Sequence, residues 1–67
     1  MNKKIEILCN SILLDGYEIE VCDNDGKATF NAYSRKAGDV IYCEDTSYNF
    51  DKVVKMLEMS GWDFYTS

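Results

Sequence analysis

Apolar residues recur with a helical period along residues 3–14. They stand at positions i, i+3, i+4, i+7 and i+8, namely Ile5, Leu8, Cys9, Ile12 and Leu13. This spacing places them on one face of an α-helix. Gly16 follows where helices commonly end, because glycine adopts the left-handed backbone conformation without strain. The pattern predicts a helix over residues 3–14 with one buried face.

From residue 17 onward the apolar period changes to two. Every odd position of residues 17–22 is apolar and every even position is glutamate or cysteine, which is typical of a strand with one buried face. Asp23-Asn24-Asp25-Gly26 predicts a hairpin turn, because these residue types accept the positive φ that tight turns demand. Second and third strands are expected over residues 27–34 and 39–44, with a turn between them. The third is apolar at both even and odd positions, so its alternation does not say which face is inward.

Residues 45–49 are expected to form a turn that leads into a second helix. Asn49 is a good N-cap residue, and Asp51 lies in the first turn, where the helix dipole favours a carboxylate. The apolar positions of this helix are Phe50, Val53, Val54 and Leu57. Gly61 ends the pattern, and residues 62–65 follow as a short extended tail.

The expected fold is one α+β domain over residues 1–67: a helix, a three-stranded antiparallel meander, a second helix and a short extended C-terminal tail. Each helix has one apolar face and the chain offers no second core, so both helices must cover the same face of the sheet. The residues expected to face the helices are Tyr17, Ile19, Val21 and Phe30. The opposite face of the sheet stays open.

Negative charge is concentrated in two segments of a chain whose net charge is −5. Residues 15–26 contain five carboxylates and residues 39–51 contain four, with no basic residue in either segment. The open face should collect Glu18, Glu20 and Tyr33, together with either Tyr42 and Glu44 or Asp39 and Ile41. Carboxylates interleaved with tyrosines suit a basic, partly apolar protein surface. The expected partner-binding residues are Glu18, Glu20, Asp23, Asp25, Tyr33, Tyr42 and Glu44. The alternative is that the acidic strands are solvated and only keep a small domain soluble.

Catalysis and metal binding find little support in the sequence. There is no histidine, so acid–base chemistry would fall to a pair such as Glu18 and Glu20, about 7 Å apart between Cα atoms. Glycosidase carboxylates show such separations, but they sit in clefts that a single small layer lacks. Asp23-Asn24-Asp25-Gly26 matches part of an EF-hand loop without the required glutamate. The three cysteines are widely spaced and have no histidine to complete a zinc site. We expect a protein that is not an enzyme and needs no metal or cofactor.

Direct binding to nucleic acid or membrane is not expected either. A helix, three strands and a helix is also the layout of the double-stranded-RNA-binding domain. That family grips phosphates with lysines at the start of its second helix, where this chain has Asn49-Phe50-Asp51-Lys52. A net charge of −5 repels RNA. No apolar run approaches the roughly 20 residues that span a bilayer, and the N-terminus lacks the features of a signal peptide. The expected location is the cytoplasm of a host cell.

The second helix runs directly into Gly61-Trp62, at the end of a small acidic chain. In this layout, which covers nearly the whole chain, the protein resembles the small phage-encoded anti-CRISPR proteins. It is similar in arrangement to a type II-A inhibitor that blocks its effector nuclease as a DNA mimic. The resemblance implies an inhibitor that occupies a basic nucleic-acid-binding site of a CRISPR effector nuclease.

The size of the domain limits such mimicry. A globule of this length is about 28 Å across, and duplex DNA of that length carries about 16 charges. The chain has 12 carboxylates and 7 basic residues, so it can imitate only a short phosphate stretch. The alternative function is a structural or regulatory module that self-associates or binds through its aromatic tail, Trp62-Asp63-Phe64-Tyr65. Either function allows a monomer or a weak homodimer.

Overall fold

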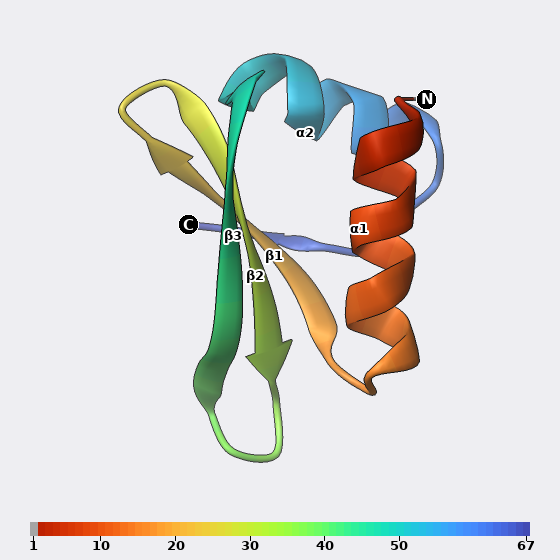
Figure 1. Cartoon of the computed structure of the whole chain (residues 1–67), viewed down its shortest axis with the longest axis vertical. Coiled ribbons are helices and arrows are strands. Elements are labelled where there is room, and N and C mark those ends of the chain that lie inside the picture. Colours follow the sequence, from red (N-terminus) through yellow and green to blue (C-terminus); the bar gives the residue numbers. More distant parts are fainter. Residues whose placement is uncertain (1) are drawn as a thin grey trace.

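The computed structural model describes residues 2–67, which form two helices on one face of a four-stranded sheet (Figure 1). The elements in chain order are α1 (Lys3–Leu14), β1 (Glu18–Asn24), β2 (Lys27–Ser34), β3 (Asp39–Asn49), α2 (Phe50–Met59) and β4 (Tyr65–Thr66). The strand order is β3-β2-β1-β4, with β1, β2 and β3 antiparallel and β4 parallel to β1. The predicted α+β fold and its order of elements are confirmed.

Both helices begin at an asparagine that caps them. The side chain of Asn2 accepts hydrogen bonds from the backbone N–H groups of Lys4 at 2.9 Å and Ile5 at 3.3 Å. The side chain of Asn49 accepts one from the backbone N–H of Lys52 at 3.0 Å. These bonds satisfy donors that the first helical turn leaves without partners. The predicted cap at Asn49 is therefore confirmed.

Each helix ends in the same glycine-dependent arrangement. Gly16 and Gly61 both have a positive φ, at 87° and 75°. After α1, the N–H of Tyr17 donates to the carbonyl of Ile12 at 3.1 Å, across the glycine. The equivalent bond after α2 joins residues 62 and 57, also at 3.1 Å. This is the Schellman motif, and it turns the chain sharply out of each helix.

The core lies between the helices and one face of the sheet, which we call the helix side. Its fully buried members are Ile5, Cys9, Ile12, Ile19, Val21, Ala28, Phe30, Ala32, Val53 and Leu57. Phe30 is the largest of them. Both helices and strands β1 and β2 contribute, as the amphipathic patterns predict. Neither helix of residues 2–67 is long and apolar enough to cross a bilayer.

Strand β3 is longer than the sequence indicated, and the predicted turn over residues 45–49 is wrong. The strand continues to Asn49 and passes directly into α2. The hydroxyl of Thr46 donates to the backbone carbonyl of Ala28, and the ring of Tyr48 packs against the core. These two contacts hold a polar segment in an extended conformation that its composition does not favour.

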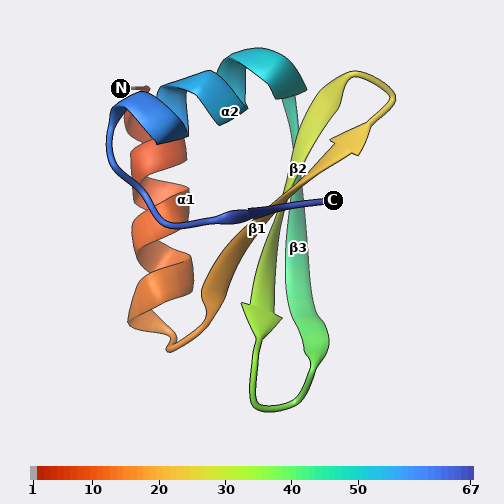
Figure 2. The ribbon, with the colours of Figure 1, turned by 180° about the vertical axis from the view of Figure 1, so that it is seen from behind.

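The C-terminal segment returns to the sheet, where β4 lies beside β1 (Figure 2). Trp62 and Phe64 are half-buried and pack against the core on the way. Tyr65 stands on the sheet opposite Glu20 and is 41% exposed. Two of the three rings of the aromatic tail therefore serve the interior of the domain.

Candidate protein interface

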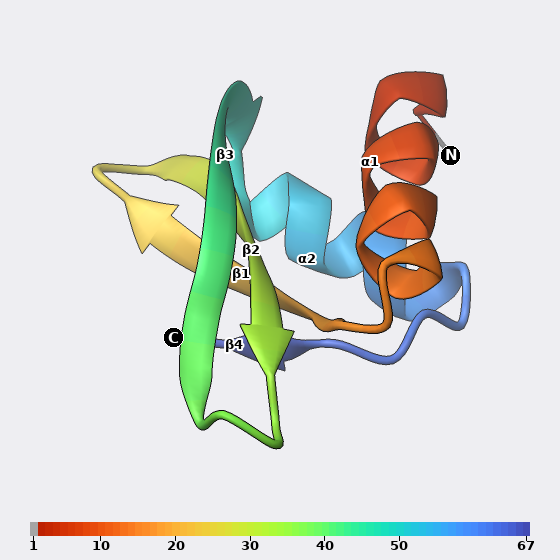
Figure 3. The same cartoon turned by 60° about the horizontal axis from the view of Figure 1, so that its bottom comes forward.

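The register of the strands decides which side chains occupy the face of the sheet that no helix covers among residues 2–67. Cross-strand partners point to the same face. Glu18 pairs with Tyr33 and Glu20 pairs with Asn31, while their neighbours Ile19 and Phe30 are buried on the helix side. Extending the register to β3 and β4 completes this surface, which we call the open face (Figure 3). It consists of Glu18, Glu20, Cys22, Asn24, Lys27, Thr29, Asn31, Tyr33, Val40, Cys43, Asp45, Asn49 and Tyr65, so that Lys27 is the one basic residue on it.

Three of the expected partner-binding residues, Glu18, Glu20 and Tyr33, lie together on the open face. Asp23 was expected on this face too, but it belongs to β1 and pairs with the buried Ala28, so its side chain lies on the helix side near the tip of the hairpin. Asp25 lies in the turn itself, beyond the end of the open face. Asp25 has a φ of 52°, and the carboxylate of Asp23 accepts the N–H of Gly26 at 2.7 Å. The side chain of Asp23 is therefore already occupied in shaping the turn.

Tyr42 and Glu44 were expected on the open face, and this placement is wrong. Tyr42 pairs with Ala32 and Glu44 pairs with Phe30, so both side chains lie on the helix side. The reason is a β-bulge, because the register skips Ile41 between Val40 and Tyr42. An extra residue reverses the alternation beyond it. Asp39, of the other expected pair, lies on the helix side as well, because it pairs with Ser34, and the register gives Ile41 no partner. The residues of β3 whose partners lie on the open face are Val40, Cys43, Asp45 and Asn49.

On the helix side, Tyr42 links β3 to the connection between α1 and β1. Its hydroxyl donates to Asp15 Oδ2 at 2.8 Å, and its ring meets the ring of Tyr17 edge to face with centroids 6.0 Å apart. Burial, followed by the hydrogen bond to Asp15, raises the pKa of Tyr42 to about 12. The phenol therefore stays protonated near neutral pH and keeps donating this bond.

At one end of the open face, Glu18 is neutralised within the domain. Arg35 Nη2 lies 3.5 Å from Glu18 Oε1 and donates to the hydroxyl of Tyr65 at 2.6 Å. That hydroxyl donates to Glu18 Oε1 at 3.2 Å, and the ring of Tyr65 packs edge to face on Tyr33. The hydrogen bond with Tyr65, and then the charge of Glu18, raise the pKa of Arg35 above its ordinary value. Glu18 is thus part of a cluster that ties β4 to the end of β2.

In the middle of the open face, Glu20 is oriented without being neutralised. Asn31 Nδ2 donates to Glu20 Oε1 at 2.9 Å and to Cys22 Sγ at 3.0 Å. Cys22 Sγ lies 2.8 Å from the hydroxyl oxygen of Ser67. Asn31 is the buried polar residue of the domain, at 8% exposure. Arg35–Glu18 is the one salt bridge among residues 2–67, so the charge of Glu20 remains available to a partner.

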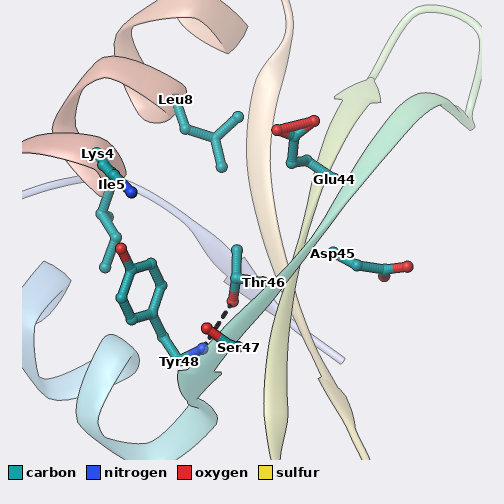
Figure 4. Close-up of a pocket in the computed structure, with 8 residues that line it drawn as sticks. All are labelled: Lys4, Ile5, Leu8, Glu44, Asp45, Thr46, Ser47 and Tyr48. Carbon is teal, nitrogen blue, oxygen red and sulfur yellow. Dashed lines mark hydrogen bonds between the residues drawn. The ribbon is translucent and has the colours of Figure 1, made fainter.

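A groove lies on the helix side, between α1 and β3 (Figure 4). It has a volume of about 290 Å³ and is lined by Lys4, Ile5, Leu8, Glu44, Asp45, Thr46, Ser47 and Tyr48. The ring of Tyr48 points toward Ile5 and Lys4, and Glu44 points to the side of Leu8. Asp45 points to the other side of the strand, in agreement with its hydrogen bond from the hydroxyl of Thr29 at 2.8 Å. The groove exists because β3 extends beyond the cover that α1 provides.

Sequence reasoning missed Asn31, Arg35 and Asp45, and it named Tyr65 only as part of the aromatic tail and not as a member of the open face. A signal for Asn31 was present, because a two-residue turn at Asp25-Gly26 makes residues 24 and 27 partners. Counting back along both strands then pairs Glu20 with Asn31. Tyr65 carried no such signal, since its partner strand lies about 45 residues earlier in the chain.

Comparisons with known proteins found no match to this chain among protein-family models, curated proteins or solved structures. Function is therefore argued from the two surfaces described above, the open face and the groove beside β3.

Proposed function

We propose that this chain is a protein-binding module and that its open face docks onto a basic protein surface. The observation that carries the proposal is Asn31, whose buried amide orients the carboxylate of Glu20. Asp45 is held in the same way by the hydroxyl of Thr29. Oriented carboxylates lose little conformational entropy when a cation binds them. The rings of Tyr33 and Tyr65 lie on the same face and offer the apolar contact typical of interfaces.

The partner we propose is a nucleic-acid-processing defence complex, with the chain acting as its inhibitor in the host cytoplasm. The small size, net charge of −5 and layout shared with small anti-CRISPR proteins support this assignment. The domain measures 29 × 23 × 16 Å, which suits a pocket built for a few phosphates. Its carboxylates would occupy the cationic site that a CRISPR effector nuclease uses to hold DNA.

A competition experiment tests this proposal. Target DNA and the purified chain would compete for a guide-loaded CRISPR effector nuclease, with fluorescence anisotropy of the DNA as the readout. The double variant Glu20→Gln/Asp45→Asn removes the two oriented charges of the open face but keeps acceptors for their hydrogen bonds from Asn31 and Thr29. The control Glu6→Gln/Glu58→Gln removes two charges from exposed positions of the helices.

We expect the open-face variant to compete about tenfold less well, since tenfold corresponds to about 1.4 kcal/mol. The control variant should compete within about twofold of the unmodified chain. Raising the salt concentration should weaken the unmodified chain more than the open-face variant, because salt screens exposed charges. Equal effects of the two double variants would rule out the open face as the docking surface.

A further inference from the structure

The two edges of the sheet differ in how they are protected. Natural proteins shield edge strands by making them short or by placing lysine, proline or a bulge on them. At one edge β4 has only two residues, whereas β3 at the other edge has eleven. β3 contains no lysine, arginine or proline, and its two register irregularities, at Ile41 and between Asp45 and Asn49, lie toward its two ends. Residues 42–45 therefore form a regular strand whose outer edge has no partner among residues 2–67.

The hydrogen bonds of β4 establish which backbone groups point to this edge. The carbonyl of Val21 accepts the N–H of Ser67 at 3.2 Å, so odd-numbered residues of β1 face β4. Backbone directions alternate along a strand, and therefore Glu20 and its partner Asn31 face each other. The even-numbered residues of β2 consequently face β3.

The same alternation carries over to β3. Tyr42 and Glu44 are the partners of Ala32 and Phe30, so their backbone groups bond to β2. The N–H and C=O groups of Cys43 and Asp45 therefore point away from the sheet. Both residues are exposed, and an extended chain lying about 4.8 Å beyond β3 could bond to them.

The groove between α1 and β3 gives such a chain a place for its side chains. Alternate side chains of an added strand would point to the helix side, over the half-buried side chains of Leu8 and Tyr48. The others would point to the open face, beside the carboxylate of Asp45. Asp39, Glu44 and Asp45 give β3 three negative charges and no positive one. The edge thus favours a segment in which apolar and basic residues alternate.

We propose that β3 binds an extended segment of the basic partner by strand addition, with apolar side chains over the groove and lysine or arginine side chains near Asp45. This mode takes affinity from main-chain hydrogen bonds and specificity from alternate side chains. The inference rests on the proposed function, because the segment belongs to the same basic partner. It adds a backbone-mediated contact to the charge-mediated contact of the open face.

The test uses a short synthetic peptide of alternating valine and lysine and two variants at one position. Cys43→Pro removes the edge-facing N–H without removing a hydrogen bond to β2, a placement that edge strands tolerate. Cys43→Ala changes the side chain and keeps the N–H. We expect the proline variant to bind the peptide about tenfold more weakly and the alanine variant to bind within about twofold of the unmodified chain. Circular dichroism would verify that each variant is folded.

A second measurement avoids the variants altogether. Peptide binding should slow hydrogen exchange at the amides of Cys43 and Asp45 in the unmodified chain, because those amides would become donors. Binding without this protection, or no binding at about 1 mM peptide, would overturn the proposal. So would a concentration-dependent dimer that the proline variant abolishes, since a second copy would then occupy the edge.

The competition experiment separates this inference from the proposed function. If Cys43→Pro competes as well as the unmodified chain while Glu20→Gln/Asp45→Asn does not, the function stands and strand addition is wrong. If the peptide protects the edge amides but no variant affects competition with DNA, the edge is a binding site and the proposed function is wrong.

Discussion

Asn31→Asp is the sharpest perturbation of the open face, because it exchanges one amide nitrogen for an oxygen. In the unmodified chain Asn31 Nδ2 donates to Glu20 Oε1 at 2.9 Å. The substitution replaces this donor with an acceptor and sets two carboxylates against each other at a site that is 8% exposed. The shape of the residue hardly changes, so packing against its neighbours is preserved and the effect is electrostatic.

The expected loss of stability is about 3 kcal/mol at neutral pH. A hydrogen bond to a charged group contributes roughly 1.5–3 kcal/mol, and repulsion between the carboxylates adds to its loss. For a chain of this length the total free energy of unfolding is roughly 3–10 kcal/mol. Repulsion raises the pKa of one carboxyl in the folded variant above its unfolded value of about 4. The penalty is therefore largest at neutral pH and disappears as the pH falls below about 4, where both states are protonated.

Urea unfolding followed by circular dichroism at neutral and at acidic pH measures both features. Asn10→Asp is the matched control, since it makes the same chemical change and the same change in net charge at an exposed position of α1. The control should alter stability by no more than about 0.5 kcal/mol. If Asn31→Asp falls within that range, or if its penalty does not shrink at low pH, Asn31 does not orient Glu20.

Three further predictions concern the core and the cysteines. Phe30→Leu removes three carbon atoms from a side chain that is 1% exposed, so the free energy of unfolding measured in urea should fall by about 2 kcal/mol. The control Tyr33→Phe, on the opposite face of β2, should change the free energy of unfolding by less than about 0.5 kcal/mol. The exposed thiol of Cys43 should react with a disulfide reagent at once, whereas Cys9 should react only on unfolding. Burial raises the pKa of Cys9 from 9.0 to about 11. Stability should therefore fall by at most about 2 to 3 kcal/mol as the pH rises across that range, and Cys9→Ala should lack this part of the fall.

The helices, the first two strands and the buried face of the sheet were predictable because local signals agree there. Asn49 caps a helix whose apolar positions have a helical period, and Asp25-Gly26 closes a hairpin between two alternating strands. The core residues Ile19, Val21 and Phe30 follow from that alternation alone. In these segments propensity, capping and burial all favour the same structure.

The length and orientation of β3 were not predictable, because contacts from elsewhere in the chain determine them. Its polar second half is extended through the bond of Thr46 to β2 and the packing of Tyr48. The bulge at Ile41 reverses the alternation of side chains between the two faces of the sheet, and no residue type in the segment predicts a bulge. The alternation of this strand therefore could not decide between Tyr42 with Glu44 and Asp39 with Ile41, and Asp45 was overlooked because residues 45–49 were expected to form a turn.

Among residues 2–67 no helix covers the open face, and only α2 packs on β3, near the end of that strand. A packed helix is about 10 Å wide and strands lie about 4.8 Å apart, so one helix shields roughly two strands. α1 packs on β1. α2 packs across β1, β2 and β3 at the end of the sheet where β3 leads into α2. Residues 2–67 form no third helix that could pack on β3, and Leu8 and Tyr48 border a groove there. An added strand would satisfy the edge-facing backbone of Cys43 and also cover these two half-buried side chains. Lysine or proline on an edge strand hinders pairing with another chain. The absence of both from β3 is therefore consistent with an edge that binds an added strand.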